Sequence, residues 1–390
     1  MHQDPAEPTG QPGMLTVLRE WGRIGCIGFG GPPAHIRLLR QTCVERRGWL
    51  DPAEFEDAIA ACNLLPGPAS TQLAIFCAWR VRGRPGALAG GAAFILPGLV
   101  LILALSALFL AGSPPAWVKG AGAGAGAAVA AVAVQAGASL MPASWRRAGQ
   151  ASRFRWAAYL LAGAAAAATI GPWLVLVLLG CGMTELAIRY ARGGTAAGVA
   201  ALPLLAVGAI GGGVSLSLAW VALKVGALSY GGGFVIIPLM QADAVGRYHW
   251  MTGGQFLNAV ALGQVTPGPV VQTVSVVGYA AAGVAGGLLA AVVAFSPSFA
   301  FVLLGAPHFS RLRDNEKAGA FLGGAGPAAI GAILGSAIPL ARALSEPWQF
   351  ALLAAAAVVL LVLRRGVVLT LLACGVAGVI FAVAGAALPH

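Results

Sequence analysis

Two short motifs hold the residues of this chain that are best suited to bind a ligand. The first contains Asn63 and Pro66-Gly67-Pro68, and the second contains Gln264 and Pro267-Gly268-Pro269. Proline and glycine interrupt a helix, so each motif leaves backbone N–H groups without intrahelical partners. Hydroxyl and amide side chains accompany both interruptions: Ser70, Thr71, Gln72, Thr266, Gln272 and Thr273. Such donors at the positive end of a helix dipole form an oxyanion site without any arginine, whereas a single kink would only bend a packed helix.

The two motifs belong to an internal repeat. They lie 201 residues apart, and Phe29-Gly30-Gly31 matches Tyr230-Gly231-Gly232 at the same spacing, which continues without a gap to Phe94 and Phe295. A duplicated unit explains this agreement. We predict four segments: a disordered tail at 1–13, a first repeat at 14–196, a connecting helix at 197–213 and a second repeat at 214–390.

The composition indicates a membrane protein. Hydrophobic residues make up 58% of the chain and charged residues only 9%, against about 25% charged in a soluble domain. Apolar stretches long enough to cross a bilayer recur along the chain. We therefore predict an all-α polytopic membrane protein. The expected crossings are 85–111, 117–141, 155–170, 172–188, 197–212, 285–306, 318–340, 348–363 and 367–387.

The arginines indicate how the two repeats are oriented. Residues 37–47 carry four arginines, whereas their counterpart at 238–248 carries one; farther along, 112–116 carries no basic residue, whereas 307–317 carries three. Short connections rich in Lys and Arg stay in the cytoplasm. The two halves should therefore be an inverted-topology repeat, with the N-terminus cytoplasmic. Each Gly-Gly and Pro-Gly-Pro element is either a re-entrant hairpin or a broken crossing, and the charges favour hairpins.

Two basic residues precede the Gly-Gly motifs. Lys224 lies within an apolar stretch with no acid nearby in sequence, and Arg23 is its counterpart in the first repeat. A lysine at the centre of a bilayer costs about 3 kcal/mol and usually marks a pathway or a partner. Together the two would give a cavity a charge suited to a small dianion, although Arg23 is also well placed to extend toward the interface.

Other polar residues give weaker signals. His35 follows the first Gly-Gly motif, where it fits either substrate or proton binding or a packed interfacial role. Glu185 and Asp243 fit proton coupling or helix capping. The six cysteines form no C-x-x-C pair, so we expect neither disulfides nor a metal site, and we expect no cofactor.

Several motifs together resemble the chromate ion transporter family. The likeness rests on residues 29–36, 46–50, 54–55 and 63–68 in the first half and extends to 231–238 and 267–269, so it covers both halves like the long members of that family. The resemblance implies a multi-pass carrier in the bacterial inner membrane that exports chromate and confers resistance, with sulfate as a related ligand. In the second copy Ile236 stands where His35 would be.

The predicted function is therefore secondary transport of a tetrahedral oxyanion by alternating access. The alternatives are a carrier of sulfate or another small anion, and an anion channel. The net charge of +11 fits topology signals beside lipid better than nucleic-acid binding. No H-E-x-x-H motif supports an enzyme. The substrate-binding residues we expect are Arg23, Gly30, Gly31, His35, Asn63, Pro66, Gly67, Pro68, Ser70, Thr71, Lys224, Gly231, Gly232, Gln264, Thr266, Pro267, Gly268, Pro269 and Gln272. The sequence leaves a homodimer open.

Overall fold

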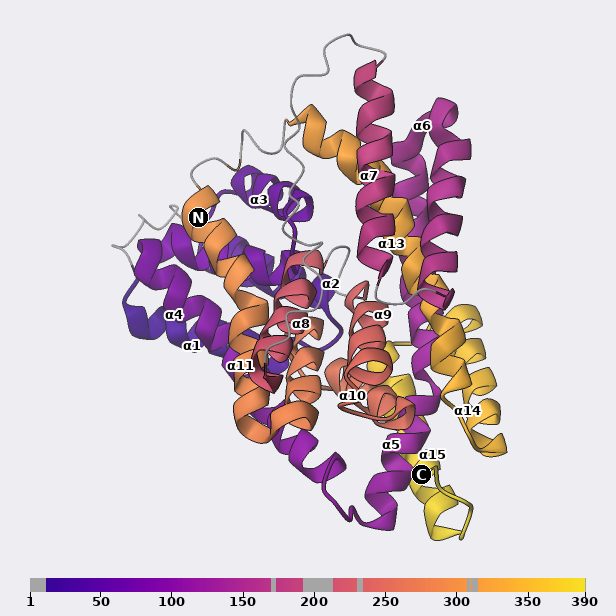
Figure 1. Ribbon diagram of the computed structural model, residues 1–390. Coiled ribbons are helices and arrows are strands. Elements are labelled where there is room, and N and C mark those ends of the chain that lie inside the picture. The colour runs from indigo at the N-terminus through magenta and orange to yellow at the C-terminus, as the bar shows by residue number, and fades with distance from the viewer. Residues whose placement is uncertain are drawn as a thin grey trace.

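The computed structural model describes residues 12–169, 173–191, 213–229, 234–306, 309 and 315–389, and all regular structure within them is helical (Figure 1). The first half contains α1 (Met14–Ile27), α2 (Pro32–Arg40), η1 (Gln41–Arg46), α3 (Pro52–Leu64), α4 (Ala69–Phe109), α5 (Ala116–Ala127), α6 (Val129–Thr169) and α7 (Leu174–Ala191). The second contains α8 (Val214–Leu228), α9 (Ile236–Gln241), η4 (Ala242–Arg247), α10 (Gly253–Val265), η5 (Val270–Gln272), α11 (Thr273–Gly305), α13 (Glu316–Arg342), α14 (Pro347–Ala357), η7 (Val358–Val362) and α15 (Val367–Val383).

The element boundaries follow the sequence repeat. The π-helical turns η1 and η4 are displaced by 201 residues, and so are α3 and α10. The displacement then changes, because the non-helical residues inside α4 and α11 end at Gly83 and Gly283, 200 residues apart. The gapless match expected from the sequence is thus wrong beyond the Pro-Gly-Pro motifs, where the second copy is one residue shorter. Gln72 and Gln272 are consequently equivalent.

Local sequence explains where the equivalent helices α3 and α10 begin; these and the other helical limbs of each hairpin are called arms below. The Asp51 side chain accepts a hydrogen bond from the Ala53 N–H, and Pro52 occupies the first helical position of α3. At the start of α10, Thr252 and Gln255 form a reciprocal capping box instead. Either arrangement satisfies N–H groups that a helix start leaves free. Two different capping solutions therefore start the same arm in the two copies.

Three long helices fold back on themselves. Gly83, Gly283 and Gly149 have φ near +60° inside α4, α11 and α6 respectively. Across the first bend, a Cβ on Gly90 would lie 2.5 Å from the Ala78 Cβ, so the two arms of α4 run antiparallel in contact. Across the second, a Cβ on Gly278 would lie 2.4 Å from the Gly286 carbonyl oxygen. Both α4 and α11 are thus tight helical hairpins.

Two further hairpins precede each of these bends. In the first copy, Arg80 near the end of the first arm of α4 pairs with Glu54 at the start of α3. Arg47 after η1 pairs with Glu20 in α1, with 2.5 Å between Nη2 and Oε1. These contacts hold antiparallel arms whose interrupted segments lie at the far end, near Gly67 and Gly30. In the first copy, the arms on either side of Gly30 and of Gly67 are therefore antiparallel.

Within the part of the chain that the structure describes, four helices are long and apolar enough to cross a membrane: Ala69–Phe109, Ala116–Ala148, Val270–Gly305 and Glu316–Arg342. They contain the crossings expected at 85–111, 117–141, 285–306 and 318–340. Those expected at 348–363 and 367–387 fall on shorter apolar helices. Residues 155–170 and 172–188 fall largely on the second arm of α6 and on α7, outside the four, and 197–212 lies outside the described residues. The chain is a polytopic helical membrane protein.

Glycine faces join the two halves. A Cβ on Gly163 would lie 1.9 Å from the Ala328 carbonyl oxygen, and a Cβ on Gly331 would lie 1.8 Å from that of Leu160, so α6 and α13 touch through their backbones. The expected small-residue stripe of α5 packs in the same way, since a Cβ on Gly124 would lie 2.1 Å from the Cys374 carbonyl oxygen. Only small residues allow such an approach.

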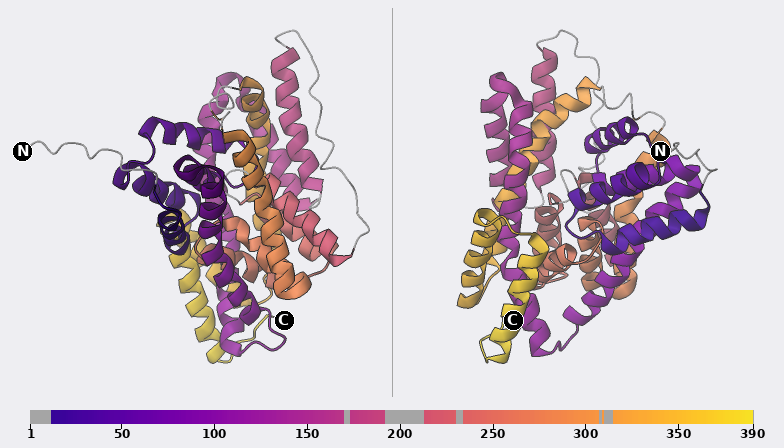
Figure 2. Two further views of the ribbon diagram at one scale, coloured as in Figure 1. Left: turned by 90° about the vertical axis from the view of Figure 1, so that its left-hand side faces the viewer. Right: turned by 180° about the vertical axis from the view of Figure 1, so that it is seen from behind.

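Corresponding helices run in opposite directions through the molecule. In Figure 1 α5 and the first arm of α6 ascend from the bottom to the top, whereas α13 begins at the top and descends. The second arm of α4 ends at the bottom, whereas that of α11 ends at the top. Figure 2 shows the same relation from behind.

Candidate functional site

The first Gly-Gly tip, residues 28–31, connects α1 to α2. Gly30 and Gly31 have φ values of +95° and +73°, which residues with a side chain rarely adopt. Pro32 and Pro33 then begin α2, where a missing N–H costs no intrahelical bond. The corresponding Gly231 and Gly232 lie outside the described residues.

The two Pro-Gly-Pro tips, residues 66–68 and 267–269, have matching backbones. The central glycines Gly67 and Gly268 have φ values of +118° and +98°. Pro68 and Pro269 are the N-caps of the following helices, and neither cap is made by a side chain. In α4 the first helical N–H groups that find a backbone acceptor are those of Thr71 and Gln72, both bonded to the Pro68 carbonyl.

Each Pro-Gly-Pro tip lies against the other copy. The Gly268 N–H donates to the Gly28 carbonyl over 3.0 Å, so the second Pro-Gly-Pro tip is bonded to the first Gly-Gly tip. A Cβ on Gly67 would lie 3.3 Å from the Gly226 carbonyl oxygen and 3.4 Å from Ser298 Oγ, both in the second half. Interruptions far apart in sequence thus meet in one interleaved region.

One cavity of about 1370 Å³ borders these tips. Five of the predicted residues line it: Gly30, Gly31, Asn63, Gly67 and Gln264. Asn63 and Gln264 are counterparts in the repeat, and each ends the arm before its Pro-Gly-Pro tip. Residues of both halves therefore contribute to the cavity from equivalent positions. Pro66, Pro68, Pro267 and Pro269 are not among the residues that line it.

Among the described residues, most buried polar atoms without partners belong to residues near the tips, whereas Asp243 belongs to the Lys224 ion pair. Within the described part of the chain they are Thr71 Oγ1, Gln72 Oε1, Ser229 Oγ, Asp243 Oδ1, Gln264 Nε2, Gln272 Oε1, Ser275 Oγ and Ser298 Oγ. An unsatisfied buried polar group costs about 1–3 kcal/mol. Such a concentration needs an explanation, and a polar ligand or ordered water at the tips supplies one.

The glutamines after the tips make unequal bonds. Gln72 Nε2 donates to the Pro66 carbonyl of its own tip over 2.8 Å. Gln272 Nε2 instead crosses to the Ile95 carbonyl in α4, 2.7 Å away. The Thr266 hydroxyl is occupied within its own helix, where it donates to the Leu262 carbonyl. Two equivalent residues thus hold different partners in this conformation.

His35 is a packed residue with both ring nitrogens engaged. Its Nε2 lies 2.9 Å from the Gly28 carbonyl oxygen, so this nitrogen carries a hydrogen and donates. Its Nδ1 lies 3.2 Å from Ser70 Oγ, and its ring meets Phe94 edge-on. The side chain is fully buried. His35 therefore ties the Gly-Gly tip to the start of α4, as the packed alternative predicts.

The predicted basic pair is not a pair of free cations. Lys224 Nζ lies 2.5 Å from Asp243 Oδ2, and both side chains are buried. Arg23 is 53% exposed and lies 3.8 Å from Glu20. Neither residue lines the large cavity. The structure therefore corrects the expectation of a doubly positive cavity, because each cation has an acid beside it. Glu20 is close to Arg23 in sequence, whereas Asp243 is 19 residues from Lys224 and meets it only through folding.

A second charged cluster lies farther along the same cavity. The buried carboxylate of Glu185 in α7 accepts from Arg155 Nε at 2.8 Å, Arg189 Nε at 3.0 Å and the Tyr159 hydroxyl at 3.3 Å. Glu185, Arg189 and Tyr159 all line the cavity, and so does Arg147. Two guanidinium groups on one carboxylate leave an excess of positive charge at this end.

Comparison with known proteins gives the family. The chromate transporter family model matches residues 15–186 and 216–379. A chromate transport protein of Cupriavidus metallidurans is 32% identical over 352 residues, covering 87% of this chain and 85% of that protein. A chromate transport protein of Pseudomonas aeruginosa is 30% identical, covering 83% and 80%. The chain belongs to the chromate transporter family.

The two matched regions of the chromate transporter family model contain the hairpin tips as well as Arg155, Tyr159 and Glu185, whereas Arg189 lies just beyond the first region. A probable chromate transport protein of Synechococcus elongatus is 29% identical over 82% of each chain. No solved structure matches this chain. The resemblance drawn from the Gly-Gly and Pro-Gly-Pro motifs is thus confirmed at the level of the family.

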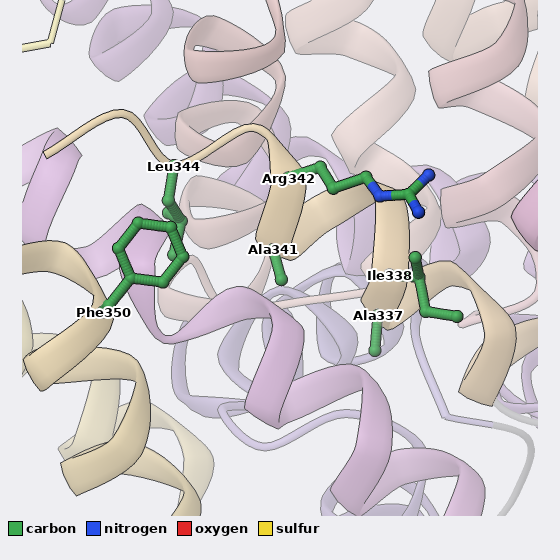
Figure 3. Close-up of a pocket in the computed structure, with 6 residues that line it drawn as sticks. All are labelled: Ala337, Ile338, Ala341, Arg342, Leu344 and Phe350. Carbon is green, nitrogen blue, oxygen red and sulfur yellow. The ribbon is translucent and has the colours of Figure 1, made fainter. Parts of the chain in front are cut away.

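A further pocket of this family member is unsuited to an anion. It lies at the end of α13 and the start of α14, where Figure 3 shows Ala337, Ile338, Leu344 and Phe350 around it. Arg342 is the one charged residue among its lining, and no buried donors converge there. The polar tips and the Glu185 cluster are therefore the better candidates.

Sequence reasoning missed the arginines of the cavity. Arg147 and Arg155 lie in the basic connection at 142–155, which positive-inside counting explains without any ligand. Glu185 was weighed as a proton-coupling or capping residue rather than as a partner of arginines. The spacing of Glu185 and Arg189 on one helix face was the available signal, and Arg155 becomes visible only when α6 folds back at Gly149.

Proposed function

We propose that this protein is a secondary carrier of a tetrahedral oxyanion, with chromate as the substrate and efflux across the bacterial inner membrane as the outcome. Membership of the chromate transporter family and the names of its relatives support the substrate. The meeting of interrupted helices from both halves at one cavity is the observation that carries the proposal.

An inverted repeat underlies the proposed mechanism, with the segments 14–196 and 214–390 as its two copies. The opposite directions of α5–α6 and α13 support it (Figure 1). Carriers with such repeats place their substrate at interrupted helices near the middle of the bilayer, and rocking of one copy against the other alternates access. The N-terminus and the arginine-rich connections would then face the cytoplasm.

The proposed substrate site consists of neutral donors. Backbone N–H groups at the starts of α4 and α11 accompany two buried side-chain donors that have no partner, the Thr71 hydroxyl group and Gln264 Nε2. Gln272 is not a free donor, because its Nε2 donates to the Ile95 carbonyl. Amide nitrogen and hydroxyl groups donate to an oxyanion, and the helix dipoles favour its charge. The paired Lys224 and exposed Arg23 act on the fold around this site rather than on the anion.

Alternating access explains why Gln72 and Gln272 have different hydrogen-bond partners. Gln272 reaches across to α4 while Gln72 stays on its own tip. In an inverted repeat the opposite-facing state is generated when the two copies exchange conformations. We therefore infer that Gln72 takes the cross-half bond in the other state while Gln272 releases it.

Glycine variants at the tips test the site. Gly67→Ala places a Cβ 2.7 Å from Gln72 Nε2, and Gly268→Leu places a side chain where φ is +98°. Each should lower the initial rate of chromate uptake into everted vesicles at least about tenfold, because strain of about 1–2 kcal/mol or more displaces the tip. Gly180→Ala is the matched control, since nothing lies within 4 Å of its Cβ.

The same vesicles distinguish the alternatives. Wild-type rates in both tip variants, at normal membrane insertion, would reject the tips as the site. Preference for sulfate or molybdate over chromate in a competition panel would change the substrate. Counterflow driven by an opposing anion gradient supports a carrier, whereas conductance that does not saturate would make the protein a channel.

A further inference from the structure

The Glu185 cluster joins two helices at one end of the cavity. Arg155 and Tyr159 lie on the second arm of α6, and Glu185 and Arg189 lie on α7. Arg155 offers a fork to the carboxylate, with Nε at 2.8 Å and Nη2 at 3.2 Å. The carboxylate of Glu185 is 2% exposed. This is the geometry in which arginine holds a planar or tetrahedral oxyanion.

Three features set the cluster apart from a simple strut between helices. Glu185 and Arg189 line the cavity that reaches the hairpin tips. The Arg189 side chain is 46% exposed, so part of its guanidinium is free to meet solute. One carboxylate faces two guanidinium groups, so its charge compensates only half of theirs.

The facing helix α13 packs closely against the Glu185 cluster through two glycines. Gly323 and Gly324 of α13 present no side chain there. A Cβ on Gly323 would lie 3.2 Å from Arg189 Nη2, and a Cβ on Gly324 would lie 2.9 Å from the Glu185 Cβ. Any larger residue would press on the ion pairs. The Gly323-Gly324 segment of α13 thus packs against the cluster with its backbone and leaves Arg189 accessible from the cavity.

We propose that Arg155, Arg189 and Tyr159 form an anion-admission site at the mouth of the cavity, and that Glu185 is its internal occupant. A small tetrahedral dianion enters by displacing the Glu185 carboxylate from the arginine donors. This inference rests on the proposed function, because it adds an entry site to the same cavity. It assigns to the connection at 142–155 a role in binding besides its role in topology.

An internal competitor gives the entry site a useful affinity. A permeating ion must bind well enough to enter and weakly enough to leave. Glu185 returns to the arginines when the anion moves on toward the tips, so the arginines are not left as buried unpaired charges. The Glu185 carboxylate thereby lowers the affinity of the arginines for the anion, and it also lowers the free-energy cost of releasing the anion.

The test measures equilibrium binding of labelled sulfate to the purified full-length protein at low ionic strength. Glu185→Gln keeps the shape of the side chain and removes the competing charge. It should tighten sulfate binding about tenfold, since a unit charge a few ångströms away is worth more than 1.4 kcal/mol in a partly buried site. Arg189→Gln should weaken binding by a similar factor.

Matched controls lie outside the cluster. Arg153→Gln removes an arginine two residues from Arg155 that packs over Trp145 instead. Glu45→Gln removes an exposed carboxylate in η1. Both should leave the affinity unchanged. They show whether a change follows from the cluster or from net charge alone.

The outcomes separate the entry site from the carrier. If Glu185→Gln lowers thermal stability but binds sulfate no more tightly, and Arg189→Gln binds as the wild type does, the cluster is a structural ion pair and the entry site is wrong. Chromate transport by the wild type would then still stand. If the wild type neither binds nor transports any tetrahedral anion, the proposed function fails and the entry site fails with it. If Glu185→Gln does not fold, Arg189→Gln decides between the two outcomes. The Arg189 side chain is nearly half exposed, so its replacement should not prevent folding.

Discussion

Lys224 and Asp243 form the buried ion pair of the second Gly-Gly hairpin. Their atoms approach to 2.5 Å across the two arms, and the ammonium group also lies 5.9 Å from the Trp220 ring centre. In the first copy the polarity is reversed, because α1 supplies the acid Glu20 and the segment after α2 supplies Arg47. Both copies of the hairpin therefore contain an ion pair, but the acid lies on the first arm in one copy and on the second arm in the other.

A buried pair of this kind is sensitive to the loss of one partner. Lys224→Ala should lower stability by about 3–5 kcal/mol, because it leaves Asp243 buried and uncompensated. The double variant Lys224→Met with Asp243→Leu should recover most of that loss. Thermal denaturation followed by size-exclusion chromatography in detergent measures both. If the single variant is as stable as wild type while its transport fails, Lys224 binds substrate after all.

Among the elements, the hairpins matter most because their tips carry backbone groups that no helix satisfies. Among the described residues, glycines with positive φ lie at the tips and bends, as at Gly30, Gly67, Gly83 and Gly268. Small residues then allow arms from different copies to touch, as at Gly98, where a Cβ would lie 2.1 Å from the Pro267 carbonyl oxygen. Close contact of this kind couples the tips to movements of the helices behind them.

Gln272 is the hydrogen-bonding link between the second tip and α4. Gln272→Leu should reduce transport about five- to tenfold, because it leaves the Ile95 carbonyl without its donor at a cost of about 1–3 kcal/mol. Initial rates in proteoliposomes measure the effect. Gln349→Leu is the matched control, since its Nε2 also donates across the halves, to Ala123, but away from the tips. Equal loss of rate in both variants would assign the effect to stability alone.

For the whole molecule, the opposite directions of equivalent helices make a prediction about sidedness. Ser113 before α5 and Ser345 before α14 lie at turns that should face the periplasm, whereas Gln150 beside the bend of α6 should face the cytoplasm. Cysteine substitutions at these three exposed positions, in a background without the exposed Cys26, report this with a membrane-impermeant maleimide. Ser113→Cys and Ser345→Cys should react in intact cells, and Gln150→Cys only in everted vesicles. Labelling of Gln150→Cys and Ser345→Cys from one side would reject the inverted repeat.

The sequence by itself determined the repeat, the membrane class and the positions of the tips. Proline and glycine act locally, so Pro66-Gly67-Pro68 interrupts a helix whatever packs around it. The caps at Asp51 and the family motifs are local in the same sense. These features needed no knowledge of partners distant in sequence, and the structure and comparisons agree with them.

Only the tertiary structure decided which charges meet and which residues share a cavity. Lys224 looked unpaired because its acid is nineteen residues away, across a turn. Arg155 looked like a topology signal until the bend at Gly149 brought it to Glu185. Electrostatic pairing depends on distance in space, which chain folding shortens without leaving a trace in local composition. For the same reason the sequence predicts an anion beside free cations, whereas the site that we propose from the fold consists of neutral donors at the tips and arginines at the mouth.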